Sequence, residues 1–280
     1  MASSDFVAGA GPRTPLSYGK DASARVAGIY RTAEIERQRA VCVELLASRP
    51  GERVLDIGCG PGLLAVDLAR SVGRHGRVLA ADVSVDMLSI AARSAEAAGV
   101  SAVIAPLRLD ATAIPLAGGV MDAVVAVQTL EWVPRVDDAL AESFRVIRPG
   151  GRILVLDTDW SAIQWHSDDP QRLDRLVAAW AGATAWAALP RSLPDRLRAA
   201  GFADVEVATL PIEADRLDPD GYAARQIDHM AAVVRERGAL RDDELAAIHA
   251  EQRTLSRTGR FHFRVLRTIV TARRPGSAAR

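Results

Sequence analysis

Hydrophobic and polar residues alternate along this chain in a pattern that predicts strands and helices in turn. After a helical segment at 33–48, short and almost fully apolar runs indicate strands, and amphipathic segments between them indicate helices. The strands are expected at 53–58, 77–83, 103–109, 123–129 and 152–157, and the helices at 63–72, 85–98 and about 136–147. Such strands, joined by helices, are typical of a parallel sheet that helices cover on both faces.

The second half of the chain is less regular. Helices are expected at 171–186 and 193–200, then a strand at 205–210, two inserted helices between 219 and about 256, and a last strand at 261–271. Residues 1–32, which begin rich in Gly, Ser, Ala and Pro, are expected to form a flexible arm or lid. The remainder, 33–280, is expected to be one α/β domain with helical cap insertions at about 160–200 and 216–258.

The clearest chemical signal is the segment VLDIGCGPG, which joins the first strand to the next helix. The glycines Gly58, Gly60 and Gly62 allow positive φ and a close approach of the backbone to a ligand. The dinucleotide-binding fingerprint of dehydrogenases needs glycine at the next position, where this chain has Leu63. With Asp56 at the strand end, the loop suits a cationic nucleotide that bears an amino acid better than it suits a pyrophosphate.

Acidic residues also end the next two strands. Asp82 closes the second strand and Asp110 closes the third. In an open parallel sheet the carboxyl ends of the strands face the crevice that binds ligands, and an acid there accepts hydrogen bonds from ribose hydroxyls. Each acid alone is also a common cap of the following helix or turn. Three acids, one after each successive strand, are harder to explain as caps and favour a nucleotide site.

In these motifs the chain resembles the class I S-adenosylmethionine (SAM)-dependent methyltransferases, in particular the small-molecule branch similar to UbiE. The resemblance rests on VLDIGCGPG (54–62), AADVS (80–84), LDAT (109–112), MDAVVAVQTLEWV (121–133) and RVIRPGGRILVLD (145–157), in this order. It implies a Rossmann-like, seven-stranded sheet that is mostly parallel with an antiparallel last strand. It also implies an enzyme with SAM as cofactor and S-adenosylhomocysteine as product.

The resemblance further implies which residues bind the cofactor. They are Asp56, Gly58, Gly60 and Gly62 for the methionine end, Asp82 for the ribose, Val83 and Met87 beside the adenine, Asp110 and Ala111 at the adenine edge, and Gln128 for the amino-acid portion. In such a reaction the cofactor carries the reactive group, and the protein mainly aligns the acceptor with it.

Composition and motifs narrow the classes of molecule that could accept the methyl group. Thirty-five Lys and Arg residues balance 35 Asp and Glu residues, and this zero net charge argues against a nucleic acid or an anionic membrane as partner. Enzymes that methylate amino groups of bases carry an Asn/Asp-Pro-Pro-aromatic run where this chain reads QTLEW. Methylation of cytosine at C5 needs a nucleophilic cysteine, and neither Cys42 nor Cys59 is placed for this role. Methylation of arsenite needs several thiolates, and two cysteines are too few. The prediction is a small, largely apolar or aromatic metabolite, methylated on carbon, oxygen or nitrogen.

All five tryptophans lie between positions 132 and 186, in the segments expected to border the acceptor. Trp132 follows the fourth strand, and Trp160 and Trp165 follow the fifth. These three are expected to line a pocket for a planar or isoprenoid acceptor, or for an amine through cation–π contact. The other two are expected to pack the cap. Tyr18 and Tyr30 of the N-terminal arm are expected as lid contacts.

Few residues qualify as a general base. His166 follows the fifth strand in a segment expected to border the reacting methyl group, and it is the first candidate. His229, on the polar face of an inserted helix, is the second. Each histidine is also compatible with an ordinary surface or core position. Asp157 and Asp159 form an isolated pair of carboxylates that is typical of turns, so no metal is predicted.

Methyl transfer is the leading hypothesis for the function. A second hypothesis is that bound SAM acts as an electrostatic element in a cyclisation or rearrangement, and a third is a SAM-binding module without catalysis. Two cysteines cannot form a disulfide framework, and no apolar run is long enough to span a membrane. A cytoplasmic protein without membrane insertion is therefore expected, and a homodimer remains an open option.

Overall fold

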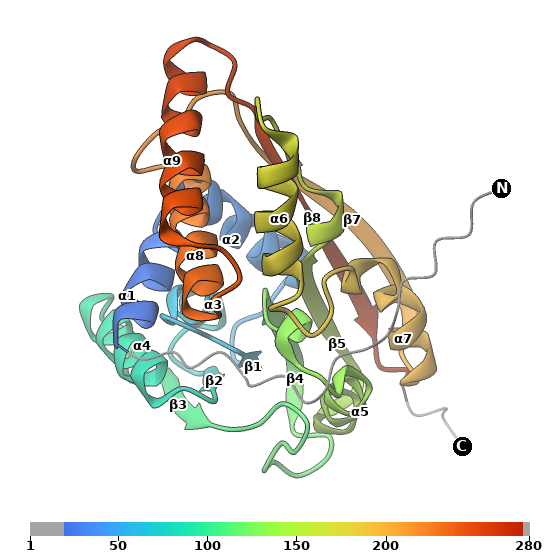
Figure 1. Ribbon diagram of the computed structural model, residues 1–280. Coiled ribbons are helices and arrows are strands. Elements are labelled where there is room, and N and C mark those ends of the chain that lie inside the picture. Colours follow the sequence, from blue (N-terminus) through green and yellow to red (C-terminus); the bar gives the residue numbers. More distant parts are fainter. Residues whose placement is uncertain (1–19, 277–280) are drawn as a thin grey trace, which may run out of the picture.

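The computed structural model describes residues 20–276, whose first half alternates helices and strands as the apolar pattern predicts (Figure 1). The elements of this half are α1 (Lys20–Ile29), α2 (Ala33–Leu46), β1 (Arg53–Ile57), α3 (Leu63–Val72), β2 (Arg77–Asp82), α4 (Val85–Ala97), β3 (Ile104–Arg108), β4 (Met121–Val127), η1 (Leu130–Trp132), α5 (Val136–Val146) and β5 (Ile147–Thr158).

The second half contains two long strands and more helices. Its elements are η2 (Trp160–Ala162), β6 (Gln164–Trp165), α6 (Pro170–Ala181), η3 (Leu189–Arg191), α7 (Leu193–Ala199), β7 (Ala203–Ala214), α8 (Tyr222–Glu236), α9 (Asp242–Arg257) and β8 (Phe263–Arg273). The two helices expected between 219 and 256 are thus present as α8 and α9.

Within the described residues, the strands form one sheet in the order β3-β2-β1-β4-β5-β8-β6, with β7 paired to the other edge of β8. Strands β1 to β5 run parallel to one another, whereas β8 runs antiparallel to both β5 and β7. This arrangement confirms the expected α/β fold with a mostly parallel sheet and an antiparallel last strand.

The sheet contains a short strand that the apolar pattern did not predict. β6 has two residues and pairs with the start of β8, just beyond the point where β5 ends. The described part of the sheet therefore has eight strands instead of seven. A two-residue strand carries too few side chains to show the period of two that identifies strands in a sequence.

Helices cover both faces of the sheet, as expected. On one face, Leu140 of α5 packs with the side chains of α7, and on the other, Leu68 of α3 packs with α2 and α4. Neighbouring residues of β1 serve the two faces, because consecutive side chains of a strand point in opposite directions. Leu55 belongs to the first cluster and Val54 to the second.

A helical cap stands at the end of the sheet where β8 begins and β7 ends. Figure 1 shows α6, α8 and α9 gathered beside this end, and their apolar side chains form a separate core around Trp180, Tyr222 and Phe263. Helix α7, which falls in the segment 160–200 expected as cap, packs against the sheet instead through Leu193 and Leu197. The cap consequently comprises α6, α8 and α9.

Helix α1 changes the interpretation of the N-terminal segment. Residues 20–29 lie in the part expected to be a flexible arm, yet they form a helix that contacts α8. Ile29 is buried in the core of the cap, and Arg25 forms an ion pair of 2.9 Å with Glu236 of α8. The segment that was expected to move freely is thus partly docked on the cap.

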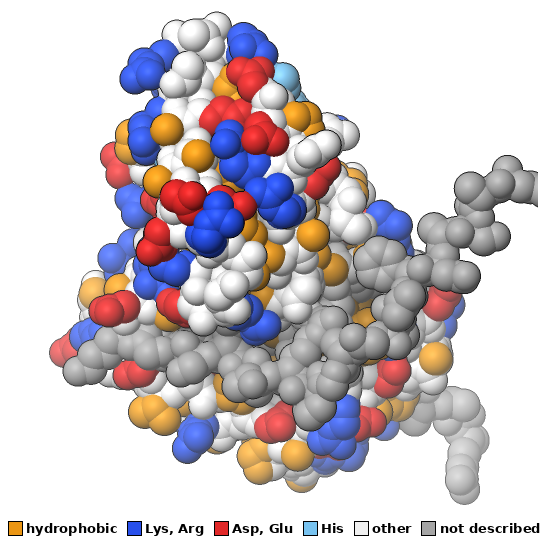
Figure 2. Space-filling model, in the orientation of Figure 1, with side chains coloured by type: hydrophobic (Ala, Val, Ile, Leu, Met, Phe, Trp, Pro, Cys, Tyr) orange, Lys and Arg blue, Asp and Glu red, His pale blue; other side chains and the backbone are white. Residues whose placement is uncertain are grey.

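The visible surface carries charges of both signs. Figure 2 shows Lys and Arg side chains interspersed with Asp and Glu side chains over the cap, in keeping with the zero net charge. Between residues 20 and 276, none of the helices has the length and apolar character needed to cross a membrane.

Candidate active site

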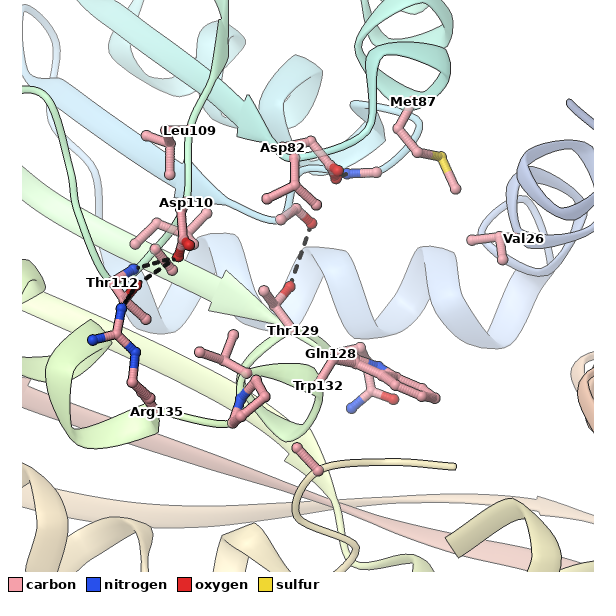
Figure 3. A pocket seen from close by; sticks show the side chains of 18 of the residues that line it. Val26, Asp82, Met87, Leu109, Asp110, Thr112, Gln128, Thr129, Trp132 and Arg135 are labelled. Atoms are coloured by element: carbon pink, nitrogen blue, oxygen red, sulfur yellow. Dashed lines mark hydrogen bonds between the residues drawn. The ribbon is translucent and has the colours of Figure 1, made fainter. Parts of the chain in front are cut away.

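A cavity of about 540 Å³ opens at the carboxyl ends of β1, β2 and β4 (Figure 3). This volume lies within the range of sites that bind small molecules and cofactors. The lining residues are Val26, Tyr30, Ile57, Gly58, Gly60, Asp82, Val83, Met87, Leu109, Asp110, Ala111, Thr112, Gln128, Thr129, Trp132, Val133, Pro134, Arg135, Ala183 and Ala185. Most of the residues predicted to bind the cofactor are among them.

The glycine loop after β1 forms part of the cavity wall. Gly60 has a φ of +51°, and a Cβ placed on it would meet nothing within 4 Å, so its backbone borders open space. Gly62 differs, because a Cβ there would lie 2.7 Å from the Cβ of Ala91 on α4. Gly62 is not among the lining residues, and its missing side chain permits close packing of the loop on α4.

Asp82 is held in place at the end of β2. Its Oδ2 accepts a hydrogen bond of 3.0 Å from the backbone N–H of Gly60, and its Oδ1 accepts one of 2.8 Å from that of Ser84. Burial raises the pKa of Asp82, although these hydrogen bonds act in the opposite direction. A carboxylate offers about four lone-pair positions, so two remain for the hydroxyl groups of a ribose.

Asp56 lies behind the glycine loop and not on the cavity surface. It is 2% exposed, and its Oδ2 has no hydrogen-bond partner among the described residues. Burial, followed by the negative charge of Asp82, raises the pKa of Asp56 to about 8. A buried acid without a partner favours a cationic or hydrogen-bond-donating ligand nearby.

The residues expected at the adenine edge also lie in the cavity wall. Asp110 and Ala111 line the cavity, and the Oδ1 of Asp110 accepts hydrogen bonds of 2.8 Å from both the N–H and the hydroxyl of Thr112. Arg135 in turn donates to the hydroxyl of Thr112 over 2.8 Å. Thr112 and Arg135 were not predicted, since each reaches the cavity from a loop that carries no periodic pattern.

Gln128 lines the cavity directly after β4. It is a non-glycine residue with a φ of +54°, a conformation that is uncommon and that clusters at functional sites. Its side-chain oxygen accepts hydrogen bonds from the hydroxyl of Thr158 and from the guanidinium of Arg267. Its side-chain nitrogen is buried without a partner among the described residues.

An aromatic and apolar wall closes the far end of the cavity. Trp132 and Tyr30 line it as predicted, together with Val26 of α1 and with Ala183. Trp132 and Tyr30 also pack against the core of the cap. Figure 3 shows Trp132 apart from Asp110, Thr112 and Arg135, so the cavity has a polar end and an aromatic end. Tyr18 lies outside the described residues.

Two of the predicted tryptophans are directed elsewhere. Trp160 is 2% exposed, and its Nε1 donates to the Glu131 carboxylate over 3.0 Å in the protein interior. Trp165 packs on Phe263 and donates to the side chain of Gln252 over 2.9 Å. Neither residue lines the cavity, because both rings fill the core of the cap and satisfy their N–H groups there.

The two predicted histidines also lie outside the cavity wall. The side chain of His166 is 42% exposed and lies 3.9 Å from Asp168, on the surface beside Arg260. His229 is buried against Trp180, and burial lowers its pKa to about 4, so it is neutral at physiological pH. Trp180 lies between His229 and Trp132, with ring-centroid distances of 5.4 and 5.6 Å. The structure thus supports neither histidine as a base at the cavity.

A buried polar cluster behind Gln128 escaped the sequence prediction. Arg267 of β8 is 2% exposed and donates to Gln128, to Thr158 and, over 2.6 Å, to the hydroxyl of Tyr222. Burial raises the pKa of Glu131 to about 7, while the charge of Arg267 acts to lower it. The apolar pattern of the last strand gave no sign that one of its arginines points inward.

No group of three or more His, Cys, Asp or Glu side chains is placed to hold a metal ion in the part of the chain from 20 to 276. Asp159, which was considered with Asp157, instead accepts hydrogen bonds from Ser161 and forms an ion pair with Arg191 over 2.6 Å. These contacts are typical of a capped turn.

Comparison with known proteins agrees with the fold and the loop motifs. Residues 55–155 match the family model described as a methyltransferase domain. The ubiquinone/menaquinone biosynthesis C-methyltransferase UbiE of Rhizobium etli is 33% identical over 131 residues, which are 47% of this chain and 48% of that protein. The chain spans less than half the length of the curated relatives it matches first.

Two solved structures extend the similarity over most of the chain. Phosphoethanolamine N-methyltransferase 2 of Haemonchus contortus, in complex with SAM, has a TM-score of 0.60 at 17% identity, covering 92% of this chain and 58% of that one. The [4+2]-cyclase SpnF has a TM-score of 0.54 at 23% identity, covering 87% and 82%. At these identities the similarity shows a shared fold.

Fold, motif order and domain match agree with one another. Residues 55–155 form a methyltransferase domain, and the described part of the chain has the fold of class I SAM-dependent methyltransferases. SAM is the cofactor of such enzymes, and the described residues fit it: Gly60 leaves open space, Asp82 has acceptor positions to spare, and the Oδ2 of Asp56 lacks a partner among the described residues.

Proposed function

We propose that this protein transfers the methyl group of SAM to a carbon, oxygen or nitrogen atom of a small, largely apolar or aromatic metabolite. The observation that carries the proposal is one cavity whose polar end has most of the predicted cofactor residues and whose other end has Trp132 and Tyr30. A cofactor and an acceptor that share one enclosed space react as if at very high concentration. The methyltransferase domain match at 55–155 supports the same reaction.

The polar end is proposed to hold the cofactor. Asp82 accepts the ribose hydroxyls, Val83 and Met87 flank the adenine, and Asp110 and Ala111 contact the adenine edge. Asp56 and Gln128 serve the amino-acid portion, with Gly58 and Gly60 between them. Bound SAM supplies an electrophilic methyl group on a sulfonium centre, and the protein's task is to hold an acceptor in line with it.

The aromatic end is proposed to hold the acceptor. Tyr30 and Trp132 offer flat apolar surfaces, which suit a planar or isoprenoid molecule and also attract a cationic amine. Among the described residues, Asp, Glu and His are absent from this end of the cavity lining. The proposal is therefore an acceptor that is nucleophilic without deprotonation by a buried carboxylate or histidine, such as the neutral form of an amine, or an enol or phenol that has already lost its proton to the solvent.

The partner in this proposal is a small molecule and not a polyanion, in keeping with the balanced charges of the sequence. Cys42 and Cys59 are both free and buried, as is common where thiols stay reduced. On this basis we propose a cytoplasmic location.

The direct test is incubation of the protein with methyl-labelled SAM and a panel of amines, phenols, enols and isoprenoids, with analysis of products by mass spectrometry. A labelled product, formed at a rate proportional to enzyme concentration, supports the proposal. Turnover of an acceptor without uptake of the label would show that SAM is not the donor.

A second candidate function is a cyclisation or rearrangement in which SAM is not consumed. The absence of an acid or histidine at the aromatic end among the described residues favours this function, because a cyclisation or rearrangement of this kind needs no base. The fold shared with the [4+2]-cyclase SpnF is compatible with it. The same incubation decides, since this function predicts an altered acceptor with the SAM label unchanged.

A further inference from the structure

Arg267 places a buried cation directly behind the cavity wall. It lies on β8, far in sequence from the cofactor motifs, and 2% of its surface is exposed. We propose that Arg267 is a positioning residue, which fixes the Gln128 amide so that its nitrogen donates to the carboxylate of the cofactor's methionine portion. This inference rests on the proposed function, because it assumes that SAM binds in this cavity.

The hydrogen bonds of Gln128 determine which way its amide faces. The side-chain oxygen accepts from the hydroxyl of Thr158 over 2.9 Å and from a guanidinium nitrogen of Arg267. Because arginine only donates hydrogen bonds, the oxygen of the amide must face Arg267. The amide nitrogen is left as a donor on the opposite side, buried and without a partner among the described residues. Such a donor calls for an acceptor atom from a ligand.

Arg267 is itself firmly held. Its second terminal nitrogen donates to the hydroxyl of Tyr222 over 2.6 Å, and its guanidinium lies 5.2 Å from the centre of the Tyr222 ring and 5.8 Å from that of Trp160. All three side chains are buried. The planar guanidinium can therefore not turn away from Gln128 without breaking contacts with the core of the cap.

The position of Gln128 indicates which part of the ligand it meets. Gln128 directly follows β4, which pairs with β1, and the adjoining Thr129 donates to the carbonyl of Gly58 over 3.4 Å. Asp56, also near the end of β1, has an acceptor oxygen without a partner among the described residues. An unpaired acceptor and an unpaired donor at the ends of neighbouring strands match the ammonium and carboxylate groups of one amino acid.

The charge of Arg267 favours an anion at this position. Glu131 and Asp157 share the same interior, and burial raises the pKa of both carboxyl groups. Because an arginine guanidinium stays protonated in proteins, its positive charge acts on the position beside Gln128 and favours a carboxylate there over a second cation.

The test compares SAM with decarboxylated SAM, which keeps the sulfonium and the amine but lacks the carboxylate. In calorimetric titrations the wild-type protein is expected to bind SAM at least about tenfold more tightly than decarboxylated SAM, as for a hydrogen bond to a charged group. Arg267→Met is expected to remove most of this preference. Gln128→Leu is expected to do the same, and the double variant no more than either alone, because both changes break one chain of contacts.

Two controls separate positioning from damage to the fold. 5′-Methylthioadenosine lacks the whole amino-acid portion, so its affinity is expected to stay within about twofold in Arg267→Met if the site is intact. Arg273→Met changes an exposed arginine at the other end of β8 and is expected to keep the wild-type preference.

Should Arg267→Met fail to fold, Tyr222→Phe removes only the hydroxyl that holds Arg267 and is expected to lower the preference about threefold.

The outcomes distinguish this inference from the proposed function. If the wild-type protein binds SAM but Arg267→Met or Tyr222→Phe keeps the full preference for the carboxylate, Arg267 has no positioning role and the inference is overturned. If the losses of this preference in Arg267→Met and Gln128→Leu multiply in the double variant, the two residues act independently, and the inference is also overturned. If the wild-type protein binds neither SAM nor 5′-methylthioadenosine, the proposed function itself fails.

Discussion

The two ends of the cavity are built by different means. At the polar end, Asp82 and Gly60 lie within a few residues of strand ends and hold each other through a local hydrogen bond of 3.0 Å. At the aromatic end, Tyr30 follows α1 and Trp132 lies on η1, and both side chains pack against the core of the cap. The polar end is thus built by the sheet and its loops, whereas the aromatic end also depends on the packing of the cap.

The largest effect is expected where the cap is packed most tightly. Trp180 is 1% exposed and packs edge-on against Trp132, Trp160 and His229. Trp180→Ala is expected to lower the free energy of unfolding by about 3–5 kcal/mol, through lost burial and a residual cavity. Urea denaturation measures this change. The matched control is Val207→Ala at a side chain that is 54% exposed, with an expected change within about 0.5 kcal/mol.

The same variant tests whether the two ends are separable. If the polar end depends on the sheet alone, folded Trp180→Ala protein keeps its affinity for SAM at low temperature. A loss of SAM affinity as large as the loss of stability would mean that cap and sheet form one unit and would contradict the division drawn above.

The next largest effect is expected at the polar end. Asp82→Ala removes the acceptor assigned to the ribose and is expected to weaken SAM binding by about 1.5–3 kcal/mol, roughly tenfold to a hundredfold. Isothermal titration calorimetry measures the dissociation constant. Glu96→Ala, at an exposed acid of α4 outside the cavity, serves as control. Equal affinity of Asp82→Ala and wild type for SAM would refute the cofactor assignment.

A smaller effect is expected from the titration of Asp56. Its pKa of about 8 means that most of the carboxyl is protonated at pH 7 before a ligand binds. A cationic ligand favours the ionised form, so SAM binding is expected to release a proton, and SAM affinity is expected to rise as the pH increases from 6 to 8. The SAM affinity is expected to rise by at most about tenfold per pH unit, the limit for release of one proton.

Titrations at pH 6.5 in buffers of different ionisation enthalpy count the released protons. Asp56→Asn cannot ionise and is expected to release none, which separates Asp56 from the titration of the SAM amino group. Identical proton release by wild type and Asp56→Asn would exclude Asp56 as the group that responds to the cation.

The smallest effect is expected at His166. Because this side chain lies on the surface with Asp168 and Arg260, His166→Ala is expected to change the rate of methyl transfer less than about twofold, within the range of surface substitutions. Trp132→Ala, by contrast, is expected to raise the KM for the acceptor and to leave SAM affinity nearly unchanged. Steady-state kinetics with both substrates varied gives these values. A large loss of rate in His166→Ala would reinstate it as the base.

The polar end could be predicted because its information is local. VLDIGCGPG and the acids Asp82 and Asp110 each stand at a fixed offset from an apolar strand, and parallel strands bring their carboxyl ends together in any such sheet. The parallel sheet and its cover of helices on both faces follow from the same apolar runs. Gly62 is the exception, since only the packing of α4 shows that it serves the fold.

The aromatic end could be predicted only in part, because composition does not tell which way a ring points. Trp132 and Trp160 both follow a strand end, yet one borders the cavity and the other is buried with its N–H bonded to Glu131. Val26 and Ala183 have no chemical signature at all. Arg267 escaped notice for a related reason: in a chain with many arginines, its burial depends on Gln128 and Tyr222, which are distant in sequence.

The central claim is that one cavity holds the cofactor at its polar end and presents the methyl group to its aromatic end. A crystal structure with S-adenosylhomocysteine tests this most directly. The account predicts ribose hydroxyls within hydrogen-bond distance of Asp82 and a sulfur atom that faces the space beside Trp132 and Tyr30. A nucleoside bound elsewhere, or a sulfur directed away from the aromatic end, would contradict it.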